Sequence, residues 1–273
     1  MKKTAFGIFS IFILSSYIFT EAIHPISREM GSGTRGAFVE IFGVQKEVKG
    51  RKVDAITSKA EVTNSTGVMI TSVVNSKNSI GYISLGSLKD NVKALKINGV
   101  APSVATINDK SYKISRPFNL VIKDTNPLIE DFLNYSVNAK SVIENAGYIA
   151  IGSVKFTSKQ PKGKILITGS SSVTPLVEKL SESYKVINPN ATIEILQSDS
   201  TTGVISVIDN IADIGMVSRD LKDTELKKGI QVKVLAIDGL AIIVNKENKI
   251  DSISSDNVKR IFLGELTKWE DIK

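Results

Sequence analysis

The chain has 273 residues, of which 42% are hydrophobic and 23% charged, and its formal net charge is +7. This composition is that of a globular protein, so it excludes a collagen, a coiled coil and an extensively disordered chain. The length allows one large domain or two smaller ones. Because the sequence has no Cys and a single His, it excludes disulfides, thiolate metal sites and Cys nucleophiles, and it argues against a multi-His metal centre.

Residues 1–22 have the pattern of a secretory signal peptide. Lys2 and Lys3 precede a mostly apolar stretch that is shorter than the roughly 20 residues of a transmembrane helix. Thr20 and Ala22 place small residues before a cleavage site at Ile23. We therefore expect export to a periplasm, without the Cys that a lipoprotein needs. An uncleaved N-terminal anchor is the alternative.

Three segments combine a polar turn with an amphipathic helix. The first is the turn at residues 28–34, which leads into a helix that carries Phe38 and Phe42 on one face. The second follows a strand at residues 165–168 and has its helix from about Thr174, and the third follows a strand at residues 193–196 and has its helix after Gly203. Strand, turn and helix repeated at this spacing predict an α/β fold with parallel strands.

Other segments extend this pattern along the chain. Residues 155–164 are polar and basic and contain Pro and Gly, so we expect a linker there. Further strands are expected at residues 81–85, 118–122, 212–217, 232–237 and 240–244, and further helices at residues 127–136 and 139–146.

The chemistry of the three turns is that of anion binding. A helix N-terminus offers unpaired N–H groups, and Ser and Thr add hydroxyl donors. If the three turns converge, they surround a small tetrahedral anion, and Arg28 can add a bidentate fork. The turns match neither the phosphate-binding loop of nucleotide hydrolases nor the nucleophile motif G-x-S-x-G. We therefore expect binding without catalysis, with no metal and no cofactor.

Several stretches resemble the periplasmic phosphate-binding proteins of phosphate ABC importers. Among them are ISREMGSGTRGAFVEIFG, ILITGSSSVTPLVEKL and SDSTTGVISVIDNIADIGMVSRDL. In that family the G-S-S-x turn usually comes first and R-x-x-G-S-G-T follows later, whereas this chain has the opposite order. The resemblance therefore implies a circularly permuted member in which residues 155–164 join the family's usual ends.

The resemblance also implies a fold and a function. The fold is the two-lobed, type II periplasmic-binding-protein fold with the ligand cleft between the lobes: lobe I at residues 104–245, and lobe II at residues 23–103 together with 246–273. The implied function is to capture inorganic phosphate and to deliver it, as a monomer without a nucleic-acid partner, to the subunits of a membrane ABC permease. Two alternatives are a binder of another oxyanion, sulfate or molybdate, and a surface adhesin or interaction protein that kept the fold.

The family's binding residues transfer to matching positions of this chain. Two positions depart from the family: Ser218 stands where some members have an Asp that accepts a proton from phosphate, which affects selectivity, and Met30 stands where an Asp often steadies the Arg, which affects the positioning of Arg28. Selectivity must then come from Glu29, Asp199 or Asp220, or from the Ser218 oxygen. The residues implied to bind phosphate are Arg28, Ser32, Gly33 and Thr34 from one lobe, and Ser172, Val173, Ser200 and Ser218 from the other.

Overall fold

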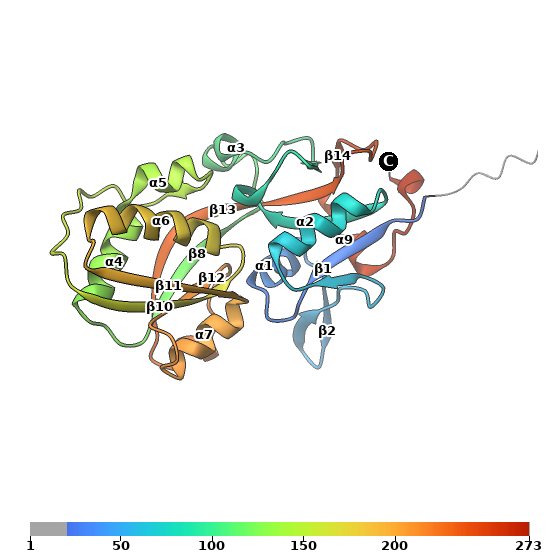
Figure 1. Ribbon diagram of the computed structural model, residues 1–273. Coiled ribbons are helices and arrows are strands. Elements are labelled where there is room, and N and C mark those ends of the chain that lie inside the picture. Colours follow the sequence, from blue (N-terminus) through green and yellow to red (C-terminus); the bar gives the residue numbers. More distant parts are fainter. Residues whose placement is uncertain (1–20, 273) are drawn as a thin grey trace, which may run out of the picture.

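The computed structural model describes residues 21–272, so the predicted signal segment lies almost wholly outside the described residues. The chain forms two lobes that share one long strand, β13 (Gln231–Asn245), which runs from one lobe into the other (Figure 1). Within residues 21–272, no helix has the length and apolar character needed to span a bilayer.

Lobe I is built on the first half of β13. The strand order is β11-β10-β12-β8-β13, in which β10 is parallel to β11 and β12, and β8 is antiparallel to β12 and β13. The lobe therefore has a mixed sheet rather than a wholly parallel one. Its elements are β8 (Ser115–Ile122), α4 (Pro127–Asn138), α5 (Lys140–Asn145), β9 (Ile149–Ala150), β10 (Gly163–Ser170), α6 (Thr174–Ile187), β11 (Ala191–Ser198), α7 (Ser200–Ile208), β12 (Ile214–Val217) and α8 (Asp223–Leu226).

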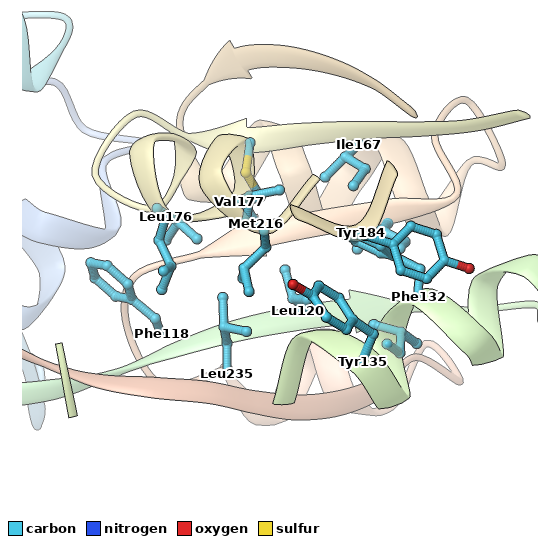
Figure 2. Close-up of a cluster of buried hydrophobic side chains, with 14 of the residues drawn as sticks. Phe118, Leu120, Phe132, Tyr135, Ile167, Leu176, Val177, Tyr184, Met216 and Leu235 are labelled. Atoms are coloured by element: carbon cyan, nitrogen blue, oxygen red, sulfur yellow. The ribbon is translucent and has the colours of Figure 1, made fainter. Parts of the chain in front are cut away.

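The core of lobe I lies between this sheet and helices α4 and α6 (Figure 2). Leu176, Leu180 and Tyr184 recur at helical spacing along α6 and are fully buried, because that face of the helix packs on the sheet. Helix α7 covers the opposite face of the sheet, where Val204 and Val207 pack on Val121.

Lobe II is built on the second half of β13, which pairs antiparallel with β5, while β1 lies parallel to β5 and β4. Helices α1 and α9 pack on one face of this sheet and α2 on the other. The elements are β1 (His24–Arg28), α1 (Gly33–Ile41), β2 (Gln45–Val48), β3 (Arg51–Asp54), β4 (Glu61–Thr63), α2 (Thr66–Asn75), β5 (Ser79–Ser84), β6 (Val92–Ala94), β7 (Lys96–Ile97), α3 (Val104–Asn108), β14 (Ser252–Ile253) and α9 (Ser255–Leu263), with 3-10 turns η1 (Leu85–Ser87) and η2 (Trp269–Asp271).

The chain crosses between the lobes near Ser115 and near Gly239. Strand β13 pairs with β8 up to Gly239, opposite Ser115, and pairs with β5 of lobe II from Leu240 onward. The side chains of Ile107, Tyr112 and Ile114, and of Leu240, Ile242 and Val244, belong to the core of lobe II. The packing thus puts residues 104–114 and 240–245 in lobe II, whereas the sequence analysis assigns them to lobe I.

The two ends of the described chain lie side by side in lobe II. Ala22 forms a β-bridge with Lys268, and the N–H of Ile23 donates to the carbonyl of Thr267 at 2.8 Å. On lobe I, residues 151–162 connect β9 to β10 without a helix or a strand, at the position of the predicted linker. The circular permutation itself stays a prediction.

Candidate functional site

Four helices begin at the interface between the lobes: α1 and α2 from lobe II, and α6 and α7 from lobe I. The first-turn N–H groups of a helix have no partner within the helix, so each of these ends offers backbone donors and the positive end of a helix dipole. The sequence analysis identified three of these helix starts and missed α2. The site therefore has more fixed donors than the sequence indicated.

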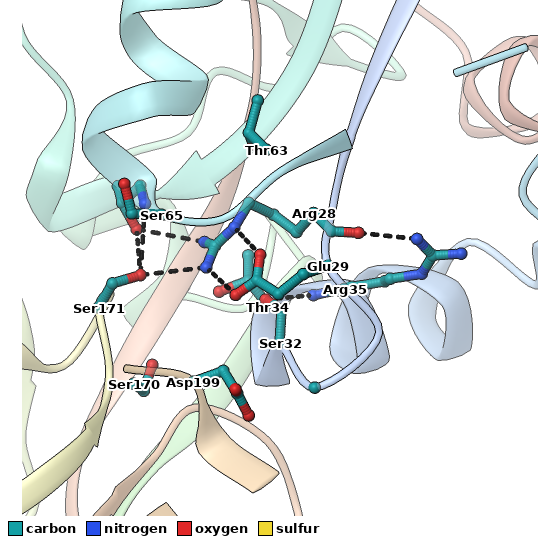
Figure 3. A network of polar contacts seen from close by, with 12 residues as sticks. Arg28, Glu29, Ser32, Thr34, Arg35, Thr63, Ser65, Ser170, Ser171 and Asp199 are labelled. Carbon is teal, nitrogen blue, oxygen red and sulfur yellow. Dashed lines mark hydrogen bonds and ion pairs between the residues drawn. The ribbon is translucent and has the colours of Figure 1, made fainter. Parts of the chain in front are cut away.

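Arg28 lies at the centre of the site, at the end of β1, and is 2% exposed. Its Nε and Nη2 atoms donate to the two carboxylate oxygens of Glu29, each at 2.7 Å (Figure 3). Its Nη2 also donates to Ser171 Oγ of lobe I at 3.1 Å. Arg35 donates from Nη1 to the carbonyl of Arg28 at 2.7 Å and is itself paired with Asp54. Arg28 is therefore held at its guanidinium by Glu29 and Ser171 and at its backbone carbonyl by Arg35.

Glu29, and not the residue at position 30, supports Arg28. Met30 is 76% exposed. The turn after β1 places Glu29 instead against the guanidinium, as a bidentate partner. The missing Asp at position 30 thus leaves Arg28 well positioned, a compensation that the sequence alone did not reveal.

Hydroxyl groups of the two lobes meet directly beside Arg28. Thr34 Oγ1 of α1 lies 2.8 Å from Ser172 Oγ, and Thr66 Oγ1 of α2 lies 3.0 Å from the same oxygen. The N–H of Thr66 also donates to Ser171 Oγ at 3.3 Å. Thr66 is 5% exposed, so its position matches that of the predicted residues, although the sequence analysis did not name it.

The predicted residues Ser200 and Ser218 lie on the lobe I side, and both are fully buried. The N–H of Ser218 donates to Ser200 Oγ at 3.1 Å, and Ser170 Oγ donates to Ser218 Oγ at 2.9 Å. Gly33 of α1 faces them so closely that a Cβ at this position would overlap Ser200 Oγ. The absence of a side chain at Gly33 thus allows the backbone of lobe II to approach these two hydroxyls.

The last two predicted residues lie in the same region but use their polar groups differently. Ser32 is the N-cap of α1, and its Oγ accepts from the N–H of Arg35 at 3.3 Å. The N–H of Val173, predicted as a ligand donor, donates instead to the carbonyl of Ser170 at 3.0 Å. The eight predicted residues are therefore close together, but the Val173 amide serves the turn before α6.

The carboxylates near the site already have donors on both oxygens. The oxygens of Glu29 accept from Arg28, and those of Asp199 accept from the N–H of Thr202 at 2.9 Å and from its hydroxyl at 2.7 Å. Asp220 is exposed.

The described residues contain no cluster of three or more His, Asp or Glu side chains that could hold a metal ion. His24, the single His of the sequence, is hydrogen-bonded to Glu61 at 2.9 Å on the surface of lobe II. The arrangement offers hydroxyl and N–H donors with one buried guanidinium, which suits a small oxyanion.

Comparison with known proteins places this geometry in a family. A family model described as a PBP superfamily domain matches residues 18–140 and 155–273. The chain is 49% identical over 256 residues to the phosphate-binding protein PstS 2 of Streptococcus agalactiae serotype V, an alignment that covers 92% of this chain and 87% of the relative. It is 41% identical over 256 residues to the protein of the same name from Streptococcus pneumoniae serotype 4, with 92% and 88% covered.

A solved structure agrees with both sequence relatives. The crystal structure of a phosphate ABC transporter, phosphate-binding protein, from Streptococcus pneumoniae has a TM-score of 0.72 to this structure at 41% identity, and covers 92% of this chain and 100% of that one. Fold and sequence thus agree, and the predicted resemblance is confirmed: the chain belongs to the PBP superfamily and, within it, to the family of phosphate-binding proteins.

Proposed function

We propose that this chain is an exported binding protein that captures inorganic phosphate between its lobes and delivers it to an ABC permease. The observation that carries this proposal is that four helix N-termini meet at the interface between the lobes, where Arg28 is 2% exposed. The names of the relatives support phosphate as the anion. Residues 1–22 serve as the export signal in this proposal.

The proposed role is transport and not turnover. The Ser218 hydroxyl accepts from Ser170 Oγ and lies 3.4 Å from the Ser200 hydroxyl, and neither Ser200 nor Ser218 has a His or carboxylate partner that could act as a base. The groups at the site therefore fix an anion by hydrogen bonds. Motion of the lobes about the two crossing points would release it to the permease.

Calorimetric titration tests the proposal. The protein is unfolded and refolded to remove bound ligand and is then titrated with phosphate and, separately, with sulfate. We expect one phosphate per chain and no heat with sulfate. If only sulfate gives heat, the ligand is another oxyanion and not phosphate. If neither anion gives heat, the transport role is contradicted.

Arg28→Ala tests the assignment of the site. This variant loses charge-assisted hydrogen bonds worth about 1.5–3 kcal/mol each, so we expect phosphate affinity to fall by more than about 100-fold. Arg260→Ala is the matched control, because Arg260 is a half-exposed arginine of α9 that pairs only loosely with Glu265. Equal losses in both variants would show that the effect is not specific to the site.

A further inference from the structure

A buried ion pair lies where β13 passes from one lobe to the other. Asp238 is the residue before Gly239, the last position at which β13 pairs with β8 of lobe I. Its partner is Arg116 of β8, which lies directly opposite Asp238 where the two strands pair. Asp238 is 0% and Arg116 is 4% exposed. Neither residue belongs to the anion site described above.

The Asp238 carboxylate connects the two lobes. Its Oδ2 accepts from Arg116 Nε at 3.2 Å and from Arg116 Nη2 at 3.1 Å. Its Oδ1 accepts from Ser84 Oγ of β5 in lobe II at 2.8 Å. One side chain is thus hydrogen-bonded to strands of both lobes at the position about which the lobes must move.

The Arg116 guanidinium connects the crossing point to the anion site. Its remaining nitrogen, Nη1, donates to the carbonyl of Ser218 at 3.0 Å. The N–H of Ser218 donates to Ser200 Oγ, so a continuous line of hydrogen bonds runs from β5 of lobe II to the start of α7. The guanidinium is planar and rigid, so it fixes the distance between the Asp238 carboxylate and the Ser218 backbone.

From this geometry we infer that Arg116 and Asp238 are positioning residues that couple closure of the lobes to anion binding. The inference rests on the proposed function. A buried ion pair is often no more stabilising than apolar residues of similar volume, because burying the charges is costly. What the pair adds is a defined geometry: rotation of lobe II about the crossing moves Ser84 relative to Asp238, and Arg116 transmits the change to Ser218.

The test compares Asp238→Asn with Glu194→Gln, which breaks the exposed Lys164–Glu194 pair in the same lobe. Three quantities are measured: the midpoint of thermal unfolding, phosphate affinity by calorimetry, and the change in radius of gyration on addition of phosphate, by small-angle X-ray scattering. For Asp238→Asn we expect phosphate to bind at least about fivefold more weakly, in the range of typical coupling between sites, and to compact the protein less. Glu194→Gln should match wild type in affinity and compaction.

A merely structural role would give a different result. If Asp238→Asn lowers the unfolding midpoint but keeps phosphate affinity within twofold and compaction equal to wild type, the inference is overturned. If Asp238→Asn does not fold, Ser84→Ala tests the inference instead, because it removes only the lobe II contact of the Asp238 carboxylate. An unchanged phosphate affinity in Ser84→Ala also overturns the inference. Failure of wild type itself to bind phosphate would instead refute the proposed function.

Discussion

Gly33→Ala should separate the lobes without removing any donor atom. A Cβ at Gly33 would overlap Ser200 Oγ and would lie 2.7 Å from Ser218 Oγ. Both serines are fully buried, and hydrogen bonds fix their hydroxyls, so neither can move away. To reach ordinary van der Waals contact at 3.4 Å, the lobes must part by at least about 0.7 Å.

This displacement is enough to break the contacts between the lobes. A separation of about 0.7 Å stretches the 2.8 Å hydrogen bond between Thr34 and Ser172 beyond the usual range, and it stretches the 3.1 Å contact between Arg28 and Ser171 further still. A bound anion would lose at least two charge-assisted hydrogen bonds for the same reason. At about 1.5–3 kcal/mol each, phosphate affinity should fall by at least about 100-fold.

Calorimetric titration with phosphate measures this loss, and Gly67→Ala is its control. Gly67 lies within α2, where a Cβ would meet nothing closer than Ser65 Oγ at 4.0 Å. Alanine there should leave affinity unchanged and should stabilise the helix by up to about 1 kcal/mol. If Gly33→Ala binds phosphate within threefold of wild type, the lobes do not approach each other at Gly33 in the bound form, and the reasoning fails.

Three further predictions concern single side chains. Thr66→Val keeps the shape but removes the hydroxyl beside Ser172, so calorimetry should show phosphate affinity about 2–10-fold weaker, whereas Thr71→Val on the exposed side of α2 should have no effect. Tyr82→Phe removes the hydroxyl bonded to Ser27 Oγ at 2.7 Å, so chemical denaturation should show a loss of about 1 kcal/mol. Burial raises the pKa of Asp238 to about 6, above roughly 3.9 in an unfolded chain, so between these values the folded protein keeps a proton that the unfolded chain has released. Stability should therefore fall as pH rises from about 4 to about 6, and denaturation of Asp238→Asn should lack this component.

The local part of the site could be predicted from the sequence. Helix α6 begins at Thr174 as predicted, because the apolar spacing that follows acts within a few residues. Helices α1 and α7 begin at Gly33 and Ser200, inside the turns that were expected to precede them, because Ser32 and Asp199 cap them there. Strand β13 was expected as two strands, at residues 232–237 and 240–244. It is continuous, since its two halves pair with β8 and β5 in turn.

Helix α2 and the role of Glu29 could not be predicted in the same way. Helix α2 consists largely of Val, Ile and Thr, which favour strands, and it is helical because Met69, Ile70 and Val73 pack on the lobe II sheet. The signal that could have found it is Ser65 as an N-cap followed by apolar residues four apart. The pairing of Glu29 with Arg28 depends on how the turn folds back, which spacing alone does not determine.

The charges at the interface suggest how the site holds an anion. Each arginine there has a carboxylate partner, so the interface carries little net charge, and attraction must come from oriented donors. The fold holds the donors at the helix ends in place, and burial strengthens the hydrogen bonds that they make. Glu29 occupies Nε and Nη2 of Arg28 but leaves Nη1 directed toward Thr66, on the side where the hydroxyls converge. The paired residues are Arg28–Glu29, Arg35–Asp54, Arg116–Asp238 and Arg219–Glu225.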